Sequence, residues 1–179
     1  MYGLVNKAIK DLVVENYGQE KWDAICLEVG HEEADFISMS PYPDKLTYDL
    51  VGAASKILNT DANSILEAFG EYWILYTADQ GYGDLLDLSG NSFTEFLRNL
   101  DILHLRINNM MPELKAPLFS TRNETEDSVE LVYKSHRVGL VPMLIGLIRG
   151  LGKRFEMVVD IQQLEKDASV DGIVFKISW

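Results

Sequence analysis

The chain has little cysteine and few basic residues. Cys26 is the only cysteine among 179 residues, which excludes an intrachain disulfide and a zinc site built from several cysteines. Lysine and arginine number 16 against 28 aspartates and glutamates, so the formal net charge is −12. Because this charge repels phosphate-rich surfaces, neither nucleic acid nor an anionic membrane is expected as a partner.

Long hydrophobic runs are also absent. The longest apolar stretch, residues 138–148, is far shorter than the roughly 20 residues that a membrane-spanning helix needs. Lys7, Lys10 and Asp11 interrupt the N-terminal segment, unlike a signal peptide, and a cytoplasmic location is expected. Hydrophobic residues still make up 47% of the chain and charged residues 25%, which is typical of a globular domain able to enclose a cavity.

The first two-thirds of the chain predicts helices. Apolar side chains recur at helical spacing in residues 2–16, 19–29 and 62–77. Another helix is expected from Asp44 to about residue 58, because Pro41 and Pro43 break the preceding segment and Asp44 is a good capping residue.

A fifth helix is expected to start with a capping box at Ser92 and Glu95 and to end at Met111 and Pro112. His104 lies on its apolar stripe. Desolvation there favours a neutral imidazole, whose free lone pair is what a haem iron needs from an axial ligand. A core histidine hydrogen-bonded to a carbonyl is the alternative that this helix alone leaves open.

The C-terminal third predicts strands at residues 128–137, 155–163 and 172–179, with a helix at about 141–152. The fold class is therefore α+β, with a mostly helical lobe followed by a lobe with a small antiparallel sheet. In the first strand, Tyr133, Ser135 and Arg137 share one face. Their hydroxyls and guanidinium suit carboxylates, although a solvated strand face is an equal alternative on composition.

Taken together, these residues resemble the haem nitric oxide/oxygen binding (H-NOX) domain family. The resemblance spans nearly the whole chain and includes the opening Met-Tyr-Gly, segments 70–73 and 146–148, His104, Pro117 and the Tyr-x-Ser-x-Arg pattern at 133–137. It implies a single H-NOX domain over residues 1–179. About residues 1–60 would form a helical distal subdomain and about 61–179 a proximal subdomain, with haem b buried between them.

The resemblance also implies roles for the residues on the proximal side. His104 would be the proximal ligand of the iron. Tyr133, Ser135 and Arg137 would bind the haem propionates, and Pro117 would press on the macrocycle and help to distort it. No partner at ligand spacing is visible for the other two histidines, so His104 is the expected metal ligand.

On the distal side, the resemblance places Val5, Trp73 and Met143. Family members that bind O₂ stably carry a tyrosine where this chain has Met143, and a thioether cannot donate a hydrogen bond to O₂. The expected function is therefore a sensor of NO and CO at ferrous haem, which signals when the His104–iron bond weakens or breaks. By resemblance, the partner would be a separate histidine kinase or cyclic-di-GMP enzyme.

Several alternatives stay open from the sequence. Trp73 carries an indole N–H and could make the protein an O₂ sensor, whereas plain core packing could explain both Trp73 and Met143. From another class, the chain could be a haem-free protein-interaction module. No nucleophile–base pair is visible, so an enzyme is not expected, and a peroxidase would need a distal histidine–arginine pair that is not evident.

Overall fold

The computed structural model describes residues 1–31 and 35–179. Its helices are α1 (Gly3–Tyr17), α2 (Gln19–Val29), α3 (Asp44–Leu58), α4 (Ala62–Thr77), α5 (Gly83–Asp87), α6 (Phe93–Arg98), α7 (Leu100–Met110) and α8 (Val141–Arg154), with a π-helical turn η1 (Ala78–Tyr82). Its strands are β1 (Leu118–Arg122), β2 (Ser128–Lys134), β3 (Asp160–Gln163) and β4 (Ile173–Ser178). No helix in the described part of the chain is long and apolar enough to span a membrane.

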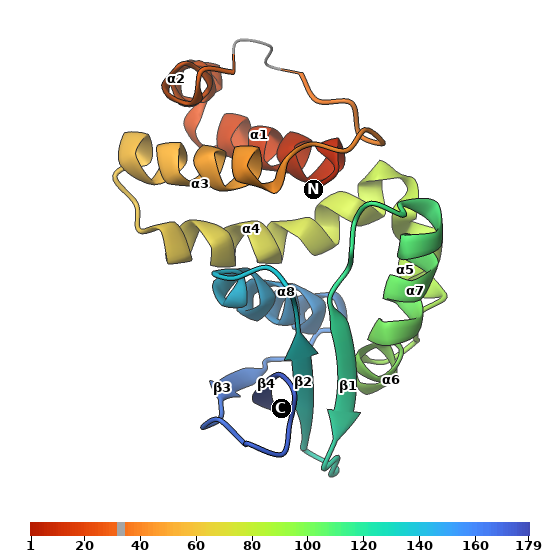
Figure 1. Cartoon of the computed structure of the whole chain (residues 1–179). Helices are drawn as coiled ribbons and strands as arrows, with labels where there is room; N and C mark the ends of the chain where they lie inside the picture. The colour runs from red at the N-terminus through yellow and green to blue at the C-terminus, as the bar shows by residue number, and fades with distance from the viewer. Residues whose placement is uncertain (32–34) are drawn as a thin grey trace.

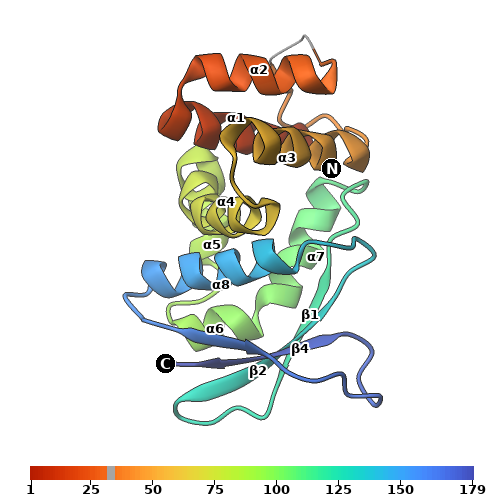
Figure 2. The ribbon, with the colours of Figure 1, turned by 90° about the vertical axis from the view of Figure 1, so that its left-hand side faces the viewer.

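The elements form successive layers (Figures 1 and 2). Helices α1 to α3 lie at one end, α4 and α8 pack against each other across the middle, and the sheet lies at the other end with α5 to α7 along one flank. The sheet is antiparallel with the order β1-β2-β4-β3. Val129, Leu131 and Tyr133 of β2 are buried on the face that packs against α8, and the α+β prediction is confirmed.

Two apolar cores are joined where α4 crosses α8. One core is built from α1 to α4 and the other from α5 to α8 and the sheet. A Cβ atom on Gly70 would lie 2.1 Å from the carbonyl oxygen of Met143, and one on Gly146 would lie 2.0 Å from that of Glu67. Only glycine allows the two backbones to touch in this way. The expected subdomain boundary near residue 60 falls between α3 and α4 and stays a prediction.

The expected fifth helix is in fact two helices. It breaks at Asn99, whose backbone leaves the helical conformation (φ −92°, ψ 1°) and whose side-chain amide donates to the carbonyl oxygen of Ser89 at 3.0 Å. Only one of the two hydrogen bonds expected for the capping box at its start is formed. Ser92 accepts from the backbone N–H of Glu95, but the Glu95 carboxylate accepts from the backbone N–H of Asn91 rather than that of Ser92.

The strands are shorter than the sequence predicted. Strand β2 ends at Lys134, because its partner β1 starts at Leu118 opposite Lys134, so Ser135 and Arg137 lie beyond the strand. The strand expected at 155–163 begins only at Asp160, because α8 continues to Arg154 and a turn follows it. Strand β1 was not predicted, since it is short and its register is set only by pairing with β2.

Candidate functional site

A cavity of about 260 Å³ lies between the two cores. Helices α1, α4, α7 and α8, the end of β2 and the loops beside it contribute to its wall. The structure brings together at this cavity all eight residues that the sequence singled out, namely Val5, Trp73, His104, Pro117, Tyr133, Ser135, Arg137 and Met143. Most other lining residues are aliphatic or aromatic, so the few polar groups are the ones that can orient a ligand.

His104 is held in one orientation within this wall. Its Nδ1 atom lies 2.7 Å from the carbonyl oxygen of Leu100, and because a carbonyl can only accept, Nδ1 carries the proton. The other ring nitrogen, Nε2, therefore keeps a free lone pair. Burial lowers the pKa of His104, although the bond to Leu100 and the charge of Asp101 act against this. The side chain is thus a neutral imidazole with one nitrogen available to a metal.

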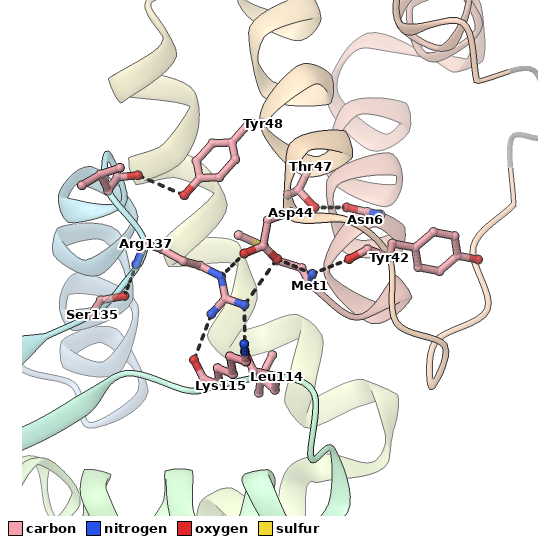
Figure 3. Close-up of polar contacts among 11 residues, drawn as sticks. Met1, Asn6, Tyr42, Asp44, Thr47, Tyr48, Leu114, Lys115, Ser135 and Arg137 are labelled. Carbon is pink, nitrogen blue, oxygen red and sulfur yellow. Dashed lines mark hydrogen bonds and ion pairs between the residues drawn. The ribbon is translucent and has the colours of Figure 1, made fainter.

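The side chain of Arg137 is bound to two separate segments (Figure 3). Its guanidinium donates to the Asp44 carboxylate, with Nε at 2.8 Å, and to the carbonyl oxygens of Leu114 at 2.7 Å and Lys115 at 3.1 Å. The N-terminal amine of Met1 pairs with the same carboxylate. Arg137 therefore joins the start of α3 to the loop that leads from α7 to β1, and Asp44 adds the chain terminus.

Asp44 has a different role from the one expected. Pro43 occupies the capping position of α3, and Asp44 is the first helical residue with no side-chain cap. Burial alone would raise the pKa of Asp44, but the hydrogen bonds and charges of Arg137 and the N-terminal amine outweigh it and lower this pKa. Sequence reasoning missed this contact because no local signal links residues 93 positions apart.

Tyr133 and Ser135 complete the polar edge of the cavity. Tyr133 is buried at the end of β2, with its ring centroid 5.5 Å from that of Phe119. The hydroxyl of Ser135 accepts from the backbone N–H of Arg137 at 3.1 Å. Pro117 lines the same side immediately before β1. Ser135 and Arg137 are thus brought to the cavity by a turn that follows the strand, rather than by a shared strand face.

The opposite wall is apolar. Val5 comes from α1, and the glycine contacts between α4 and α8 place Trp73 and Met143 in this wall. The ring of Trp73 lies between Phe69 and Tyr76, with centroids at 5.8 and 6.2 Å.

Two further lining residues, Thr77 and Tyr82, were not predicted. Thr77 donates its hydroxyl to the carbonyl oxygen of Trp73 at 2.8 Å, and the hydroxyl of Tyr82 contacts the sulfur of Met39 at 3.5 Å. Both hydroxyls are therefore directed to protein atoms. Helical spacing alone could have suggested Thr77, which lies one turn after Trp73 on α4.

Comparison with known proteins identifies the family. The profile of the family described as Haem-NO-binding matches residues 2–163. The chain belongs to this family. Domains of this family bind haem and are sensory rather than catalytic, in agreement with the expectation that the chain is not an enzyme. The residues at the cavity fit a haem, since His104 offers an imidazole nitrogen, the walls are apolar, and hydroxyls and a guanidinium stand at one edge.

The curated relatives are larger proteins. Soluble guanylate cyclase 89Db of Drosophila melanogaster is 27% identical over 155 residues, which are 87% of this chain but 23% of the cyclase. Soluble guanylate cyclase gcy-33 of Caenorhabditis elegans is 28% identical over 182 residues, which span this whole chain and 19% of that cyclase. The chain thus spans about a quarter or less of the length of these relatives.

The fold is that of solved H-NOX proteins. A mutant H-NOX protein from S. oneidensis in the Fe(II) state superposes with a TM-score of 0.89 at 21% identity, over 99% of this chain and 95% of that chain. This similarity confirms the predicted fold.

Proposed function

We propose that this domain holds haem b in the cavity, with His104 as the proximal iron ligand, and senses NO in the cytoplasm. The observation that carries the proposal is the bond from Nδ1 of His104 to the Leu100 carbonyl oxygen, which leaves Nε2 free inside a largely apolar cavity. A hydrogen bond at the second ring nitrogen fixes the tautomer and raises the basicity of a metal-binding imidazole. Ferrous haem would supply the iron that binds the gas.

The polar edge suits the carboxylates of such a cofactor. Tyr133 and Ser135 offer hydroxyls, and Arg137 offers a planar guanidinium. Four hydrogen bonds from Arg137 already go to Asp44, Leu114 and Lys115, so a propionate would share this guanidinium with Asp44 or take its place. Pro117 would contact the ring on the same side and contribute to its distortion.

Signalling would pass through α7. This helix starts at Leu100, directly after the break at Asn99, and carries His104 one turn further on. A gas that weakens the His104–iron bond would free α7 to shift against the sheet. Ile102 and Leu105 on its outer side are exposed, so such a shift would change the surface offered to a separate histidine kinase or cyclic-di-GMP enzyme.

Ligand choice would follow from the apolar wall. Met143 cannot donate a hydrogen bond to O₂, whereas NO and CO depend less on a donor. Trp73 favours a second candidate, an O₂ sensor, because its indole lines the cavity and no hydrogen bond in the described part of the chain engages its N–H.

The absorption spectrum of the haem-loaded ferrous protein tests both candidates. A Soret band that shifts with NO and CO but not in air supports the NO sensor. A stable oxy spectrum that disappears in Trp73→Phe would establish the O₂ sensor instead. Absence of any Soret band after incubation with haem would contradict both and favour a haem-free interaction module.

A further inference from the structure

Three aromatic rings lead from the cavity to the protein surface between α4 and α1. Trp73 lines the cavity. Tyr76 stacks on it with ring centroids 6.2 Å apart and an interplanar angle of 28°, and Tyr72 lies 5.5 Å further on, from centroid to centroid. Tyr76 is only 5% exposed, whereas the hydroxyl of Tyr72 reaches an exposed carboxylate. The rings form a continuous path from the cavity to solvent.

Each tyrosine of this path faces a carboxylate of α1. The hydroxyl of Tyr72 donates to Glu15 at 3.1 Å. Asp11 lies one turn earlier on α1, beside Tyr76, whose buried hydroxyl has no hydrogen-bond partner within 3.5 Å among the described residues. Burial first, and then these carboxylates, raise the pKa of Tyr72 and of Tyr76. Both phenols are therefore protonated at neutral pH, and the hydroxyl of Tyr72 is already bonded to a base.

A phenol loses an electron far more readily when its proton can move to a nearby base in the same step. At Tyr76, a core that needed only packing would be served by phenylalanine, without the cost of burying a hydroxyl that is unpaired within the described part of the chain. Tyr72 has such a base in Glu15, to which its hydroxyl donates, and Asp11 lies one helical turn earlier on α1, where its charge acts on Tyr76.

We propose that Trp73, Tyr76 and Tyr72 form an electron relay that carries oxidising equivalents from the cavity to the surface, with Asp11 and Glu15 as proton acceptors. The proposal rests on the proposed haem in the cavity, and the oxidant is hydrogen peroxide. Two tyrosine hydroxyls and one hydrogen peroxide give two tyrosyl radicals and two waters. Each tyrosine gives one electron through Trp73 and one proton through its carboxylate to solvent, while peroxide takes up two electrons and two protons as its O–O bond breaks.

The relay would protect the cavity from oxidation. Met143 lines the same wall as Trp73, and peroxide converts a methionine thioether into a polar sulfoxide. Removing oxidising equivalents through Trp73 leaves this apolar wall intact. A soluble one-electron reductant of the ascorbate class reduces the Tyr72 radical to tyrosine at the surface, and the buried Tyr76 radical is reduced in turn through Tyr72; each tyrosine takes one proton back from solvent.

Freeze-quench EPR on the haem-loaded ferric protein mixed with hydrogen peroxide tests the relay. We expect a tyrosyl signal in the wild type, its loss in the double variant Tyr72→Phe/Tyr76→Phe, and slower formation in Glu15→Gln. Tyr17→Phe is the control, because Tyr17 lies on α1 and is 50% exposed but is not part of the path. Mass spectrometry should show more Met143 sulfoxide in the double variant. A wild-type signal in the double variant, or its loss in Tyr17→Phe, would overturn the relay.

A second measurement needs no haem. Azide radicals oxidise tryptophan in the haem-free protein, and the decay of the tryptophan radical and the growth of the tyrosyl radical are followed by absorbance. Electron transfer from tyrosine to the tryptophan radical should be lost in Trp73→Phe and in the double tyrosine variant but kept in Tyr17→Phe. Equal electron transfer in the wild type and all of these variants would refute the path. A protein that shows this transfer but gives no Soret band with haem would contradict the proposed function and leave the ring path standing.

Discussion

The two walls of the cavity differ in the way their residues are held. On the side of His104, directed contacts hold two polar groups: His104 is bonded to the Leu100 carbonyl and Arg137 to Asp44. On the opposite side, Val5 and Met143 offer no hydrogen-bond donor, and their positions follow from packing and from the contact of Gly70 with Met143. If the proposed function holds, anchoring of the haem would depend on directed polar contacts, whereas selection between gases would depend on whether Trp73, which brings a donor to this wall, reaches the bound gas.

The largest effect is expected from removing the proposed iron ligand. His104→Gly should abolish the bond between protein and iron, because no other side chain is proposed to supply a nitrogen on this wall. Imidazole added in solution should restore the ferrous spectrum by filling the space of the lost ring. His136→Ala, which changes an exposed histidine, serves as the control. A wild-type ferrous spectrum of His104→Gly without imidazole would show that the ligand lies elsewhere.

The next effect is expected from Arg137→Ala. The guanidinium makes charge-assisted hydrogen bonds and its side chain is only 9% exposed, so its loss should weaken haem binding by about 2–4 kcal/mol. Lys134→Ala is the control, because Lys134 is exposed and pairs with Asp171 instead. The strength of haem binding in both variants is measured from the transfer of haem to an acceptor protein. Equal haem loss from the two variants would mean that Arg137 does not anchor the cofactor.

A smaller effect, on O₂ affinity, is expected from a substitution in the apolar wall. Met143→Tyr adds a hydroxyl that can donate to bound O₂, which is worth roughly 1.5–3 kcal/mol, or about ten- to a hundredfold in O₂ affinity. The wild type should hold no long-lived O₂ complex in air. Stopped-flow mixing of the ferrous proteins with oxygenated buffer measures the difference. If Met143→Tyr gains no O₂ affinity, position 143 does not face the bound gas.

The smallest effect is expected in the pH dependence of stability. The pKa of Asp44 is lowered by Arg137 and the N-terminal amine, so its contribution to stability is complete above the usual aspartate pKa and is lost as the pH falls through the lowered value. Asp44 is partly exposed, which limits the size of the effect. Thermal unfolding between neutral and acidic pH should show a weaker acid dependence in Asp44→Asn than in the wild type. Parallel curves would contradict this contribution.

Much of the secondary structure could be predicted from the sequence alone. Helices α1 to α4 lie within one residue of their expected bounds at nearly every end, because apolar periodicity and flanking glycine or proline act over a few residues. The same local signal placed His104 on an apolar face and Tyr133 in a strand. The family resemblance, which depends on residue identities and spacing, then indicated which other positions to consider.

The tertiary structure decided what depends on distant partners. Asn99 leaves the helical conformation within a regular apolar stripe and bonds to Ser89, ten residues earlier, and β1 forms by pairing with β2. Asp44 looks like a helix cap in the sequence, yet it binds Arg137 and the N-terminal amine of Met1. Periodicity sets which face of an element is apolar, but it carries no information on which segment covers that face. Only packing of the whole chain brings Asp44, Arg137 and the two walls of the cavity to one place.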